Sequence, residues 1–314
     1  MPEGTVALVS PRVDLVSEAL AGLSAARKTL PPKFFYDEAG CALFGAITRL
    51  AEYYPTRTEL AILRDCAPDI AAHVAPGAAM VEYGASDEGK AAILFGVLDV
   101  DAYVPIDIAH GALTALANRM RWSHRAITVY PIAADFLAPV RLPAAIRAMP
   151  KLGFFPGSTI GNFDHEAAIG FLAMARVTLG QGASLLIGVD LEKSPDILIP
   201  AYDDAKGITA AFNLNILTRL NREADADFDL ASFKHRADWN DDRKRIEMHL
   251  ESRIAQTVHV AGRRIRFNAG ETIHTENSHK FSVPHFASLA RRAGWTIETT
   301  WTDAEQLFSV HLLR

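Results

Sequence analysis

The chain has 314 residues, of which 49% are hydrophobic and 22% are charged, and its formal net charge is −5. This length admits one α/β domain with a sizeable insertion. The small negative charge gives no electrostatic reason to expect nucleic acid or an anionic membrane as a partner. The sequence starts without a signal-peptide pattern, no apolar run is long enough to span a bilayer, and Cys41 and Cys66 form no CxxC pair. We therefore expect a cytoplasmic protein, and we expect it to be a monomer.

Two aromatic-rich segments precede the first regular alternation of elements. Residues 30–37 contain two prolines followed by three aromatic residues, which predicts a fixed, extended segment. After residues 52–57, a helical pattern continues to Ile70. Thr56 or Thr58 is the predicted cap of this helix.

The centre of the chain alternates between short apolar strands and helices. A helix at 166–178, capped by Asp164, precedes the last of these strands. Such alternation predicts a parallel sheet covered on both faces, which is a doubly wound α/β fold. The predicted strands are 79–83, 103–106, 127–130, 152–155 and 184–189.

The pattern changes after residue 192. Residues 193–222 have a helical pattern, and residues 245–276 alternate with period two, with turns at 261–262 and 269–270. A helix at 284–293 and an antiparallel strand pair at 295–301 and 307–312 complete the chain. We therefore predict a Rossmann-like sheet interrupted by a smaller, inserted α+β domain. The first domain comprises residues 58–192 and 282–314, and the second comprises residues 10–57 and 193–281.

Four segments at the ends of predicted strands are candidates for a nucleotide site, because ligands bind at the carboxyl ends of such sheets. Gly84 permits a close backbone approach to a ligand, and Asp107 could accept hydrogen bonds from ribose or cap a helix. Asp135 and Phe136 could contact an adenine, or form a turn and a core contact. The polar segment 157–163 follows the fourth strand.

Two adenosine-containing cofactors fit this arrangement. A dinucleotide dehydrogenase would need a second glycine where Ser86 stands, and Asp87 and Glu88 would repel a pyrophosphate. S-adenosylmethionine carries no phosphate, and its enzymes have a terminal antiparallel strand pair. The sequence therefore favours a methyltransferase over a dinucleotide oxidoreductase. The predicted α/β fold is then a Rossmann-like class I methyltransferase sheet with an inserted, smaller α+β substrate domain.

Several blocks in one order resemble the histidine Nα-methyltransferases of ergothioneine biosynthesis, from about Leu30 to the C-terminus. The resemblance implies that histidine is converted to its Nα-trimethylated betaine, hercynine, with three molecules of S-adenosylmethionine and no metal. The first loop departs from the family's usual Gly-Ser-Gly, because it reads Gly84-Ala85-Ser86. The matching blocks are Phe35–Asp37, Glu52–Arg57, Gly157–Asn162, Ala201–Asp204, Thr209–Asn213 and Thr275–Phe281.

The resemblance also implies a role for each matching residue. Tyr36 and Tyr53 would be catalytic. The residues that would bind the cofactor are Gly84, Lys90, Asp107, Asp135 and Phe136. The residues that would bind the amino acid are Tyr53, Gly157, Asn162, Tyr202, Met248, Glu276 and Ser278, with Glu276 and Ser278 contacting the imidazole.

The residues by themselves leave other interpretations open. Glu276 could be an exposed strand glutamate, and Met248 and Phe163 could be ordinary packing residues. The eleven histidines show no metal-ligand spacing, so we expect them at the surface or in local hydrogen bonds; His279 could titrate beside the pocket. The acceptor could be another amino acid or a small amine, or the chain could be a binding module without turnover.

Overall fold

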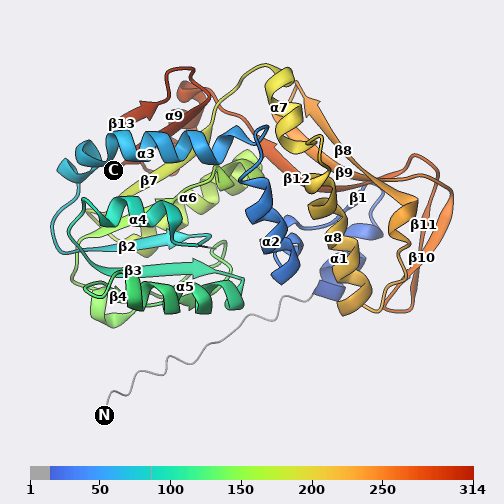
Figure 1. The fold of residues 1–314 in the computed structure, drawn as a ribbon, viewed down its shortest axis with the longest axis horizontal. Coiled ribbons are helices and arrows are strands. Elements are labelled where there is room, and N and C mark those ends of the chain that lie inside the picture. Colours follow the sequence, from blue (N-terminus) through green and yellow to red (C-terminus); the bar gives the residue numbers. More distant parts are fainter. Residues whose placement is uncertain (1–14, 86) are drawn as a thin grey trace, which may run out of the picture.

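The computed structural model describes residues 15–85 and 87–314. Residues 10–14 of the predicted second domain, and Ser86 of the first loop, lie outside the described residues. The chain forms two units that lie side by side, with the larger sheet at the left of Figure 1 and the smaller one at the right. No helix in the described ranges is long and apolar enough to cross a membrane.

The larger sheet is Rossmann-like, with a parallel core and one antiparallel strand, β14, inserted near its edge. Its strand order is β13-β14-β7-β6-β2-β3-β4, with β5 also paired to β3. From β2 the next strands, β3 and β4, are added on one side, whereas β6 and β7 are added on the other, so the switch in strand order lies between β6 and β2. This order confirms the predicted class I methyltransferase sheet. The strands are β2 (Ala78–Tyr83), β3 (Val100–Asp107), β4 (Thr128–Val129), β5 (Ile132–Ala133), β6 (Lys151–Phe155), β7 (Ser184–Asp190), β13 (Ile297–Thr302) and β14 (Phe308–Leu313).

Helices cover both faces of this sheet, as the continuous burial of β2, β6 and β7 requires. One apolar cluster joins the sheet to α3 (Tyr54–Ala72), α4 (Gly89–Phe95) and α5 (His110–Ser123). The other joins it to α6 (His165–Leu179) and α9 (Val283–Arg292). Asp164 caps α6 by accepting from the Ala167 amide at 2.8 Å, as predicted.

The smaller unit is built around a second sheet with the order β1-β12-β9-β8. The N-terminal segment joins it, because β1 pairs in parallel with β12. Its strands are β1 (Lys28–Thr29), β8 (Phe233–Asn240), β9 (Arg245–Ser252) and β12 (Thr272–His279), with a separate hairpin of β10 (Gln256–Val260) and β11 (Arg263–Phe267). Its helices are α1 (Leu15–Leu23), α2 (Glu38–Ile47), α7 (Pro195–Tyr202) and α8 (Ile208–Glu223).

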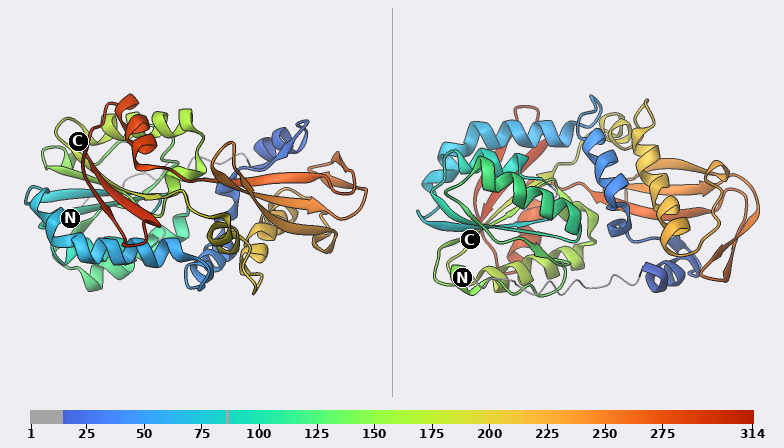
Figure 2. Two further views of the ribbon diagram at one scale, coloured as in Figure 1. Left: turned by 90° about the horizontal axis from the view of Figure 1, so that it is seen from above. Right: turned by 60° about the horizontal axis from the view of Figure 1, so that its bottom comes forward.

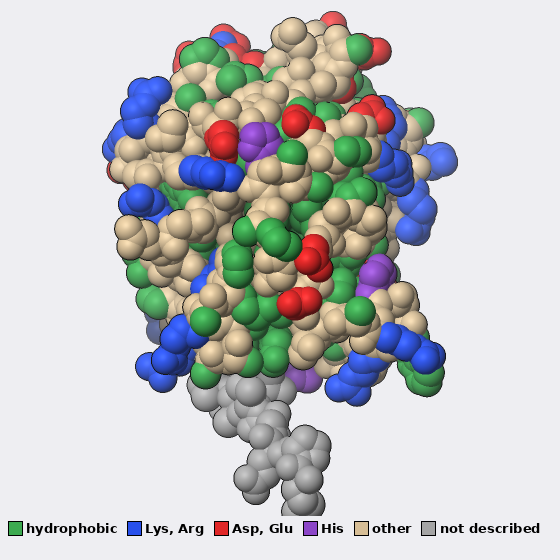
Figure 3. Space-filling view, turned by 90° about the vertical axis from the view of Figure 1, so that its left-hand side faces the viewer, with side chains coloured by type: hydrophobic (Ala, Val, Ile, Leu, Met, Phe, Trp, Pro, Cys, Tyr) green, Lys and Arg blue, Asp and Glu red, His purple; other side chains and the backbone are tan. Residues whose placement is uncertain are grey.

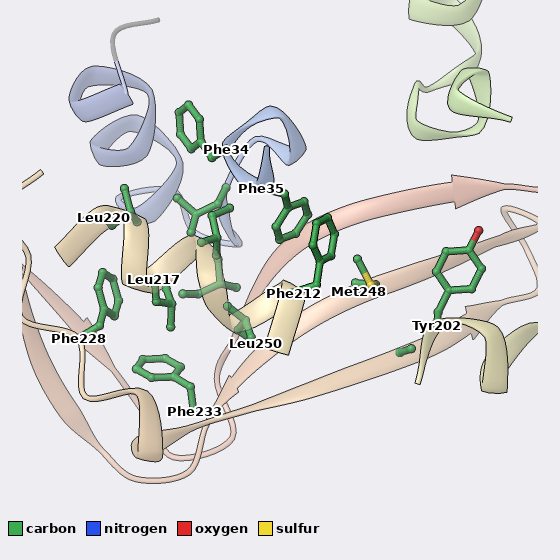
Figure 4. Close-up of a cluster of buried hydrophobic side chains, with 14 of the residues drawn as sticks. Phe34, Phe35, Tyr202, Phe212, Leu217, Leu220, Phe228, Phe233, Met248 and Leu250 are labelled. Carbon is green, nitrogen blue, oxygen red and sulfur yellow. The ribbon is translucent and has the colours of Figure 1, made fainter. Parts of the chain in front are cut away.

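A core of aromatic and aliphatic side chains holds this unit together. Phe35 and Phe212 lie with ring centroids 4.6 Å apart, joining the N-terminal segment to α8. Figure 4 shows Met248 between Phe212 and Tyr202, with the Tyr202 hydroxyl pointing away from the cluster. The buried residues of this cluster come only from residues 15–54 and 198–273.

Two local predictions were wrong. Residues Pro32–Phe35 form a short 3-10 helix rather than an extended segment, because prolines also favour the first turn of a helix. Helix α3 begins at Tyr54, with Pro55 in its first turn, so Thr56 and Thr58 lie inside it and neither caps it. The Thr58 hydroxyl instead donates to the Tyr54 carbonyl at 2.9 Å. The proposed domain boundary at 57/58 therefore falls within a helix that packs against both units.

The parallel strands point their carboxyl ends toward the smaller unit, as the arrow of β3 shows in Figure 1. The views in Figure 2 agree that the smaller unit lies at this end of the sheet. The chain passes between the two units at several points, and two of these connecting segments lie side by side. Leu191 and Phe281 form a parallel β-bridge, and the Phe281 amide donates to the Asp190 carbonyl. The opposite end carries basic groups mainly along its sides and lower edge and acidic groups at its top and middle, so that face has mixed charge (Figure 3).

Candidate active site

Three of the residues implied to bind the cofactor meet at the carboxyl ends of β2 and β3. Gly84 has φ +76°, and its amide donates to the Ile106 carbonyl at 2.8 Å, so the chain turns sharply next to Asp107. A Cβ at Gly84 would lie 3.7 Å from the Phe136 ring, which places that ring over the turn. Gly84, Asp107 and Phe136 therefore form one surface.

Asp107 is buried, and burial raises the pKa of its carboxyl group despite hydrogen bonds from the backbone. Its Oδ1 accepts from the Ala109 amide at 2.7 Å, and it does not cap α5, whose N-cap is Ala109. A carboxylate has about four acceptor positions, so it retains capacity for both ribose hydroxyls. Asp135 is used locally, because its Oδ1 accepts from the Leu137 amide at 2.9 Å.

The turn after β2 also fits an uncharged nucleoside better than a pyrophosphate. Glu88 pairs with Arg119 at 2.6 Å, and the Asp87 carboxylate accepts from the Gly89 amide at 2.7 Å. The acidic groups are thus held at the start of α4, where a phosphate would otherwise bind. These residues fit S-adenosylmethionine, and they do not fit a dinucleotide.

Lys90 follows the turn after β2, and its ammonium group reaches the turn after β6 at Gly157. Its ammonium group is 2.6 Å from Glu59, and a Cβ at Gly157 would lie 3.3 Å from the same nitrogen. The amide of Gly157 in turn donates to both Glu59 oxygens at 2.9 Å. Glu59, which the sequence analysis did not single out, therefore joins the predicted cofactor residue Lys90 to the predicted substrate residue Gly157.

The segment after β6 contacts the smaller unit directly. A Cβ at Gly161 would lie 2.8 Å from the His279 carbonyl oxygen, so η3 (Thr159–Asn162) rests against the end of β12. Asn162 follows at once, and its side-chain amide has no hydrogen-bond partner within residues 15–85 and 87–314. The contact brings Asn162 close to the end of the strand that carries Glu276 and Ser278.

Met248, Glu276 and Ser278 share one face of the smaller sheet. Glu276 is opposite Met248 and Ser278 is opposite Ile246 in the β12–β9 register. A register shift between His274 and Glu276 sets this alternation. All three side chains are buried, so Glu276 is not an exposed strand glutamate.

The Glu276 carboxyl group has no hydrogen-bond partner in the described part of the chain. Burial raises its pKa to about 8, although the Lys280 ammonium group acts in the opposite direction. An unpaired buried carboxyl group is costly, and proteins rarely keep one without a use. It is therefore a strong candidate for contact with a ligand.

Three tyrosines from separate segments surround this carboxyl group. Burial raises the pKa of Tyr36, Tyr53 and Tyr202 well above its usual value, and Glu276 raises each of them further. The charge of Asp107, in the larger unit, also raises the pKa of Tyr36. Tyr36 therefore interacts electrostatically with a carboxyl group of each unit, Asp107 and Glu276. All three hydroxyls stay neutral near pH 7, and they can donate and accept hydrogen bonds but cannot act as phenolate bases.

A buried polar network lies behind Tyr202 and Ser278, and the sequence analysis missed it. Asp190, at the end of β7, accepts from Tyr54 at 2.8 Å, from Lys193 at 2.6 Å and from Lys280 at 2.6 Å. Burial raises the pKa of Asp190, but the two ammonium groups outweigh it and hold the pKa below its usual value. The position of Asp190 at the carboxyl end of the fifth strand was the signal that could have found it.

Other expectations concern histidine and packing residues. His311 is buried but hydrogen-bonded locally, which is one of the two predicted settings, with Thr300 at 2.9 Å and Ser309 at 2.8 Å. His279 is buried as well, and burial lowers the pKa of each histidine to about 4, so His279 does not titrate near neutral pH. Phe163 stacks on Phe155 and is a core contact. The Asp204 carboxylate accepts from the Ile208 and Thr209 amides in the first turn of α8, at 3.1 and 2.7 Å, although the N-cap of that helix is Gly207. Within the described ranges, no group of three or more His, Cys, Asp or Glu side chains could hold a metal ion.

The chain is similar to known proteins over nearly its whole length. The chain is 42% identical over 312 residues to a histidine N-alpha-methyltransferase of Mycolicibacterium smegmatis, covering 95% of this chain and 96% of that protein. It is 36% identical over 301 residues to a protein of the same name from Mycobacterium tuberculosis, covering 94% and 93%. Ergothioneine biosynthesis protein 1 of Neurospora crassa is 29% identical over 297 residues, which are 91% of this chain and 33% of that protein.

Among solved structures, the CcbJ methyltransferase from Streptomyces caelestis has a TM-score of 0.46 and 13% identity, covering 80% of this chain and 88% of that one. A sequence model of a family described as histidine-specific, S-adenosylmethionine-dependent methyltransferases matches residues 15–314. The chain therefore belongs to the histidine-specific, S-adenosylmethionine-dependent methyltransferase family.

Proposed function

We propose that this enzyme transfers three methyl groups in succession to the α-amino nitrogen of L-histidine and so forms hercynine. The observation that carries the choice of substrate is the buried Glu276 carboxyl group, which has no hydrogen-bond partner among residues 15–85 and 87–314 and lies on the same strand face as Ser278. An imidazole offers one N–H and one acceptor nitrogen, which suits a carboxylate and a hydroxyl. The names of the relatives support the same substrate.

In this proposal, the sheet edge at Gly84, Asp107 and Phe136 holds the adenosine half of the methyl donor. Lys90 braces the turns on either side through Glu59. S-adenosylmethionine supplies an electrophilic methyl group on a sulfonium. The smaller unit presents the amino acid from the opposite side, with Asn162 and Tyr202 holding its backbone groups.

The chain's own contribution is orientation. The neutral hydroxyls of Tyr36 and Tyr53 can accept amine N–H bonds, which aims the nitrogen lone pair away from them and toward the methyl group. Positioning of this kind can supply roughly 7–11 kcal/mol of the barrier reduction. No strong base is required, because an α-amino group loses its proton near neutral to alkaline pH. Protons leave to water before each transfer.

The test is direct. Purified protein is incubated with L-histidine and S-adenosylmethionine, and the product mass is followed with time. We expect three added methyl groups, and we expect Nα,Nα-dimethylhistidine to be consumed as well. Tryptophan serves as the control acceptor and should stay unmodified. Methylation of tryptophan in preference to histidine, or no transfer at all, would contradict the proposal.

A further inference from the structure

Glu59 lies in α3, and its carboxylate is buried at the carboxyl edge of the larger sheet. The residue is only 1% exposed. Both of its oxygens accept from the Gly157 amide at 2.9 Å, and Oε2 lies 2.6 Å from the Lys90 ammonium group. Strand β7 leaves room for this carboxylate, because a Cβ at Gly188 would overlap Glu59 Oε1. One buried anion therefore joins the turn after β6 to the start of α4.

The turn after β6 needs support from outside itself. Gly157 and Ser158 have left-handed backbone conformations, with φ +82° and +55°, and a residue with a Cβ adopts this conformation only at a cost. Glu59 holds the Gly157 amide, while the Ser158 hydroxyl oxygen accepts from the Asp190 amide at 2.9 Å. The turn leads directly to Asn162, at the end of η3. The position of Asn162 therefore depends on the contact with Glu59.

The Lys90 ammonium group keeps donor capacity for a ligand. It has three hydrogens, and within residues 15–85 and 87–314 its ion pair is with Glu59. The side chain is 21% exposed and follows the turn at Gly84, which forms part of the surface for the adenosine. S-adenosylmethionine and S-adenosylhomocysteine carry an α-carboxylate at the end opposite the adenine. A carboxylate at this position can accept from the hydrogens of Lys90 that Glu59 leaves free.

The neighbouring titratable groups leave this ion pair intact near pH 7. Glu82 interacts electrostatically with Lys90, but burial raises the pKa of Glu82 to about 8, so it is mostly protonated and does not compete for the ammonium group. The charge of Glu59 also reaches the substrate side. Burial raises the pKa of Tyr53, and Glu59 is one of the groups that raise it further. Glu59 therefore lies within electrostatic range of residues assigned to both ligands.

We propose that Glu59 is a positioning residue that couples the binding of the two ligands. Through Lys90 it aims an ammonium group at the carboxylate of the methyl donor, and through Gly157 it fixes the turn that carries Asn162. A donor carboxylate that fixes Lys90 also fixes Glu59, which then holds the turn in the conformation that binds the acceptor. Each ligand should therefore bind more tightly when the other is present. The inference rests on the proposed function for its choice of L-histidine as the acceptor.

Titration calorimetry with S-adenosylhomocysteine and L-histidine measures this coupling, because the two form a complex that cannot turn over. The affinity for histidine is measured alone and at saturating S-adenosylhomocysteine. For the wild type we expect the second affinity to be at least about fivefold tighter, and the reverse titration must give the same factor, since such coupling is reciprocal. 5′-Methylthioadenosine has the same adenosine and a thioether but no carboxylate. It should tighten histidine binding by less than about twofold.

The variant Glu59→Gln keeps the shape of the side chain and an oxygen that can accept from Gly157, but it loses the ion pair with Lys90. Its coupling factor should fall below about twofold. Lys90→Met should have the same effect, and the double variant should lose no more than either single variant, because both act through one contact. The matched control is Asp65→Asn, which removes the same charge from an exposed position of the same helix. This control should keep the wild-type factor.

The coupling factor is a ratio of two affinities of one protein, so a general loss of stability or affinity cancels from it. A Glu59→Gln variant with the wild-type factor overturns the inference. If the variants do not fold or bind too weakly, the wild type still decides, because equal coupling with S-adenosylhomocysteine and 5′-methylthioadenosine overturns it. A wild type that methylates histidine without any coupling refutes the inference alone. A wild type that neither binds nor methylates histidine refutes the proposed function as well.

Discussion

Glu276 is the residue at which burial and chemistry conflict most clearly. The residue is 9% exposed, and its carboxyl group has no hydrogen-bond partner in the described chain. A substrate imidazole would supply the missing hydrogen-bond partner, and a side chain without a ring nitrogen would leave the buried carboxyl group unsatisfied. The same residue is therefore expected to provide both affinity and selectivity.

The variant Glu276→Ala should raise the Michaelis constant for histidine by about tenfold or more, which corresponds to about 1.4 kcal/mol. It should also narrow the preference for histidine over amino acids without an imidazole. Steady-state kinetics on both kinds of acceptor measure the two effects. Glu247→Ala is the matched control, because Glu247 lies on the other face of β9 and pairs with Arg245. An unchanged Michaelis constant in Glu276→Ala would refute the assignment.

At the scale of elements, the contact of η3 with the end of β12 joins the two units at the site. The contact depends on Gly161, where a Cβ would lie 2.8 Å from the His279 carbonyl oxygen and 3.2 Å from its amide nitrogen. Both neighbours are backbone atoms, so they cannot move aside as the end of a flexible side chain can. Any larger residue must push the turn away from the strand.

We therefore expect Gly161→Ala to destabilise the protein by about 1–3 kcal/mol, as overpacking does, and to lower kcat/KM for histidine by displacing Asn162. Denaturant unfolding and steady-state kinetics give the two numbers. The control is Gly170→Ala in α6, where a Cβ would meet no atom within 4 Å. That helical substitution should be neutral or stabilising by up to about 1 kcal/mol. Equal behaviour of the two variants would show that the contact does not matter.

At the scale of the whole molecule, buried titratable groups set how stability depends on pH. Burial raises the pKa of Glu82 and of Glu276 to about 8, so the folded protein holds these protons where the unfolded chain has lost them. Their stabilisation is complete below about pH 4.5 and is lost as pH rises toward 8. His279 and His311 act in the opposite direction, but only between about pH 4 and 6.5. Lys193, with a pKa lowered to about 8, opposes the loss only above pH 8.

The free energy of unfolding should therefore fall by about 1–3 kcal/mol between pH 6.5 and 8. Urea denaturation at several pH values in this window measures the slope. Glu276→Gln removes one of the two buried acids without changing its size, and it should flatten the slope while weakening histidine binding. A stability that rises with pH across this window would contradict the assignment of these two carboxyl groups.

The sequence by itself determined the order of the large sheet's elements, the cap of α6 and the period-two strands of the smaller unit. These follow from local patterns, in which apolar runs, capping side chains and alternation act over a few residues. The assignment of the site residues came from the resemblance to a family, and it stays a prediction, as do the domain boundaries. The structure places the predicted cofactor residues at the carboxyl edge of the larger sheet. It places Met248, Glu276 and Ser278 on strands β9 and β12 of the smaller sheet.

Only the tertiary structure decided the roles of Glu59, Asp190 and Lys280. A buried charge is recognisable only when its partners are known, and these partners are from 90 to nearly 100 residues away in sequence for the pairs Asp190–Lys280 and Glu59–Gly157. The same holds for Glu276, which looks like an exposed strand residue until the register of β12 against β9 turns it inward. Burial, register and long-range pairing are properties of the folded chain, and no local pattern encodes them.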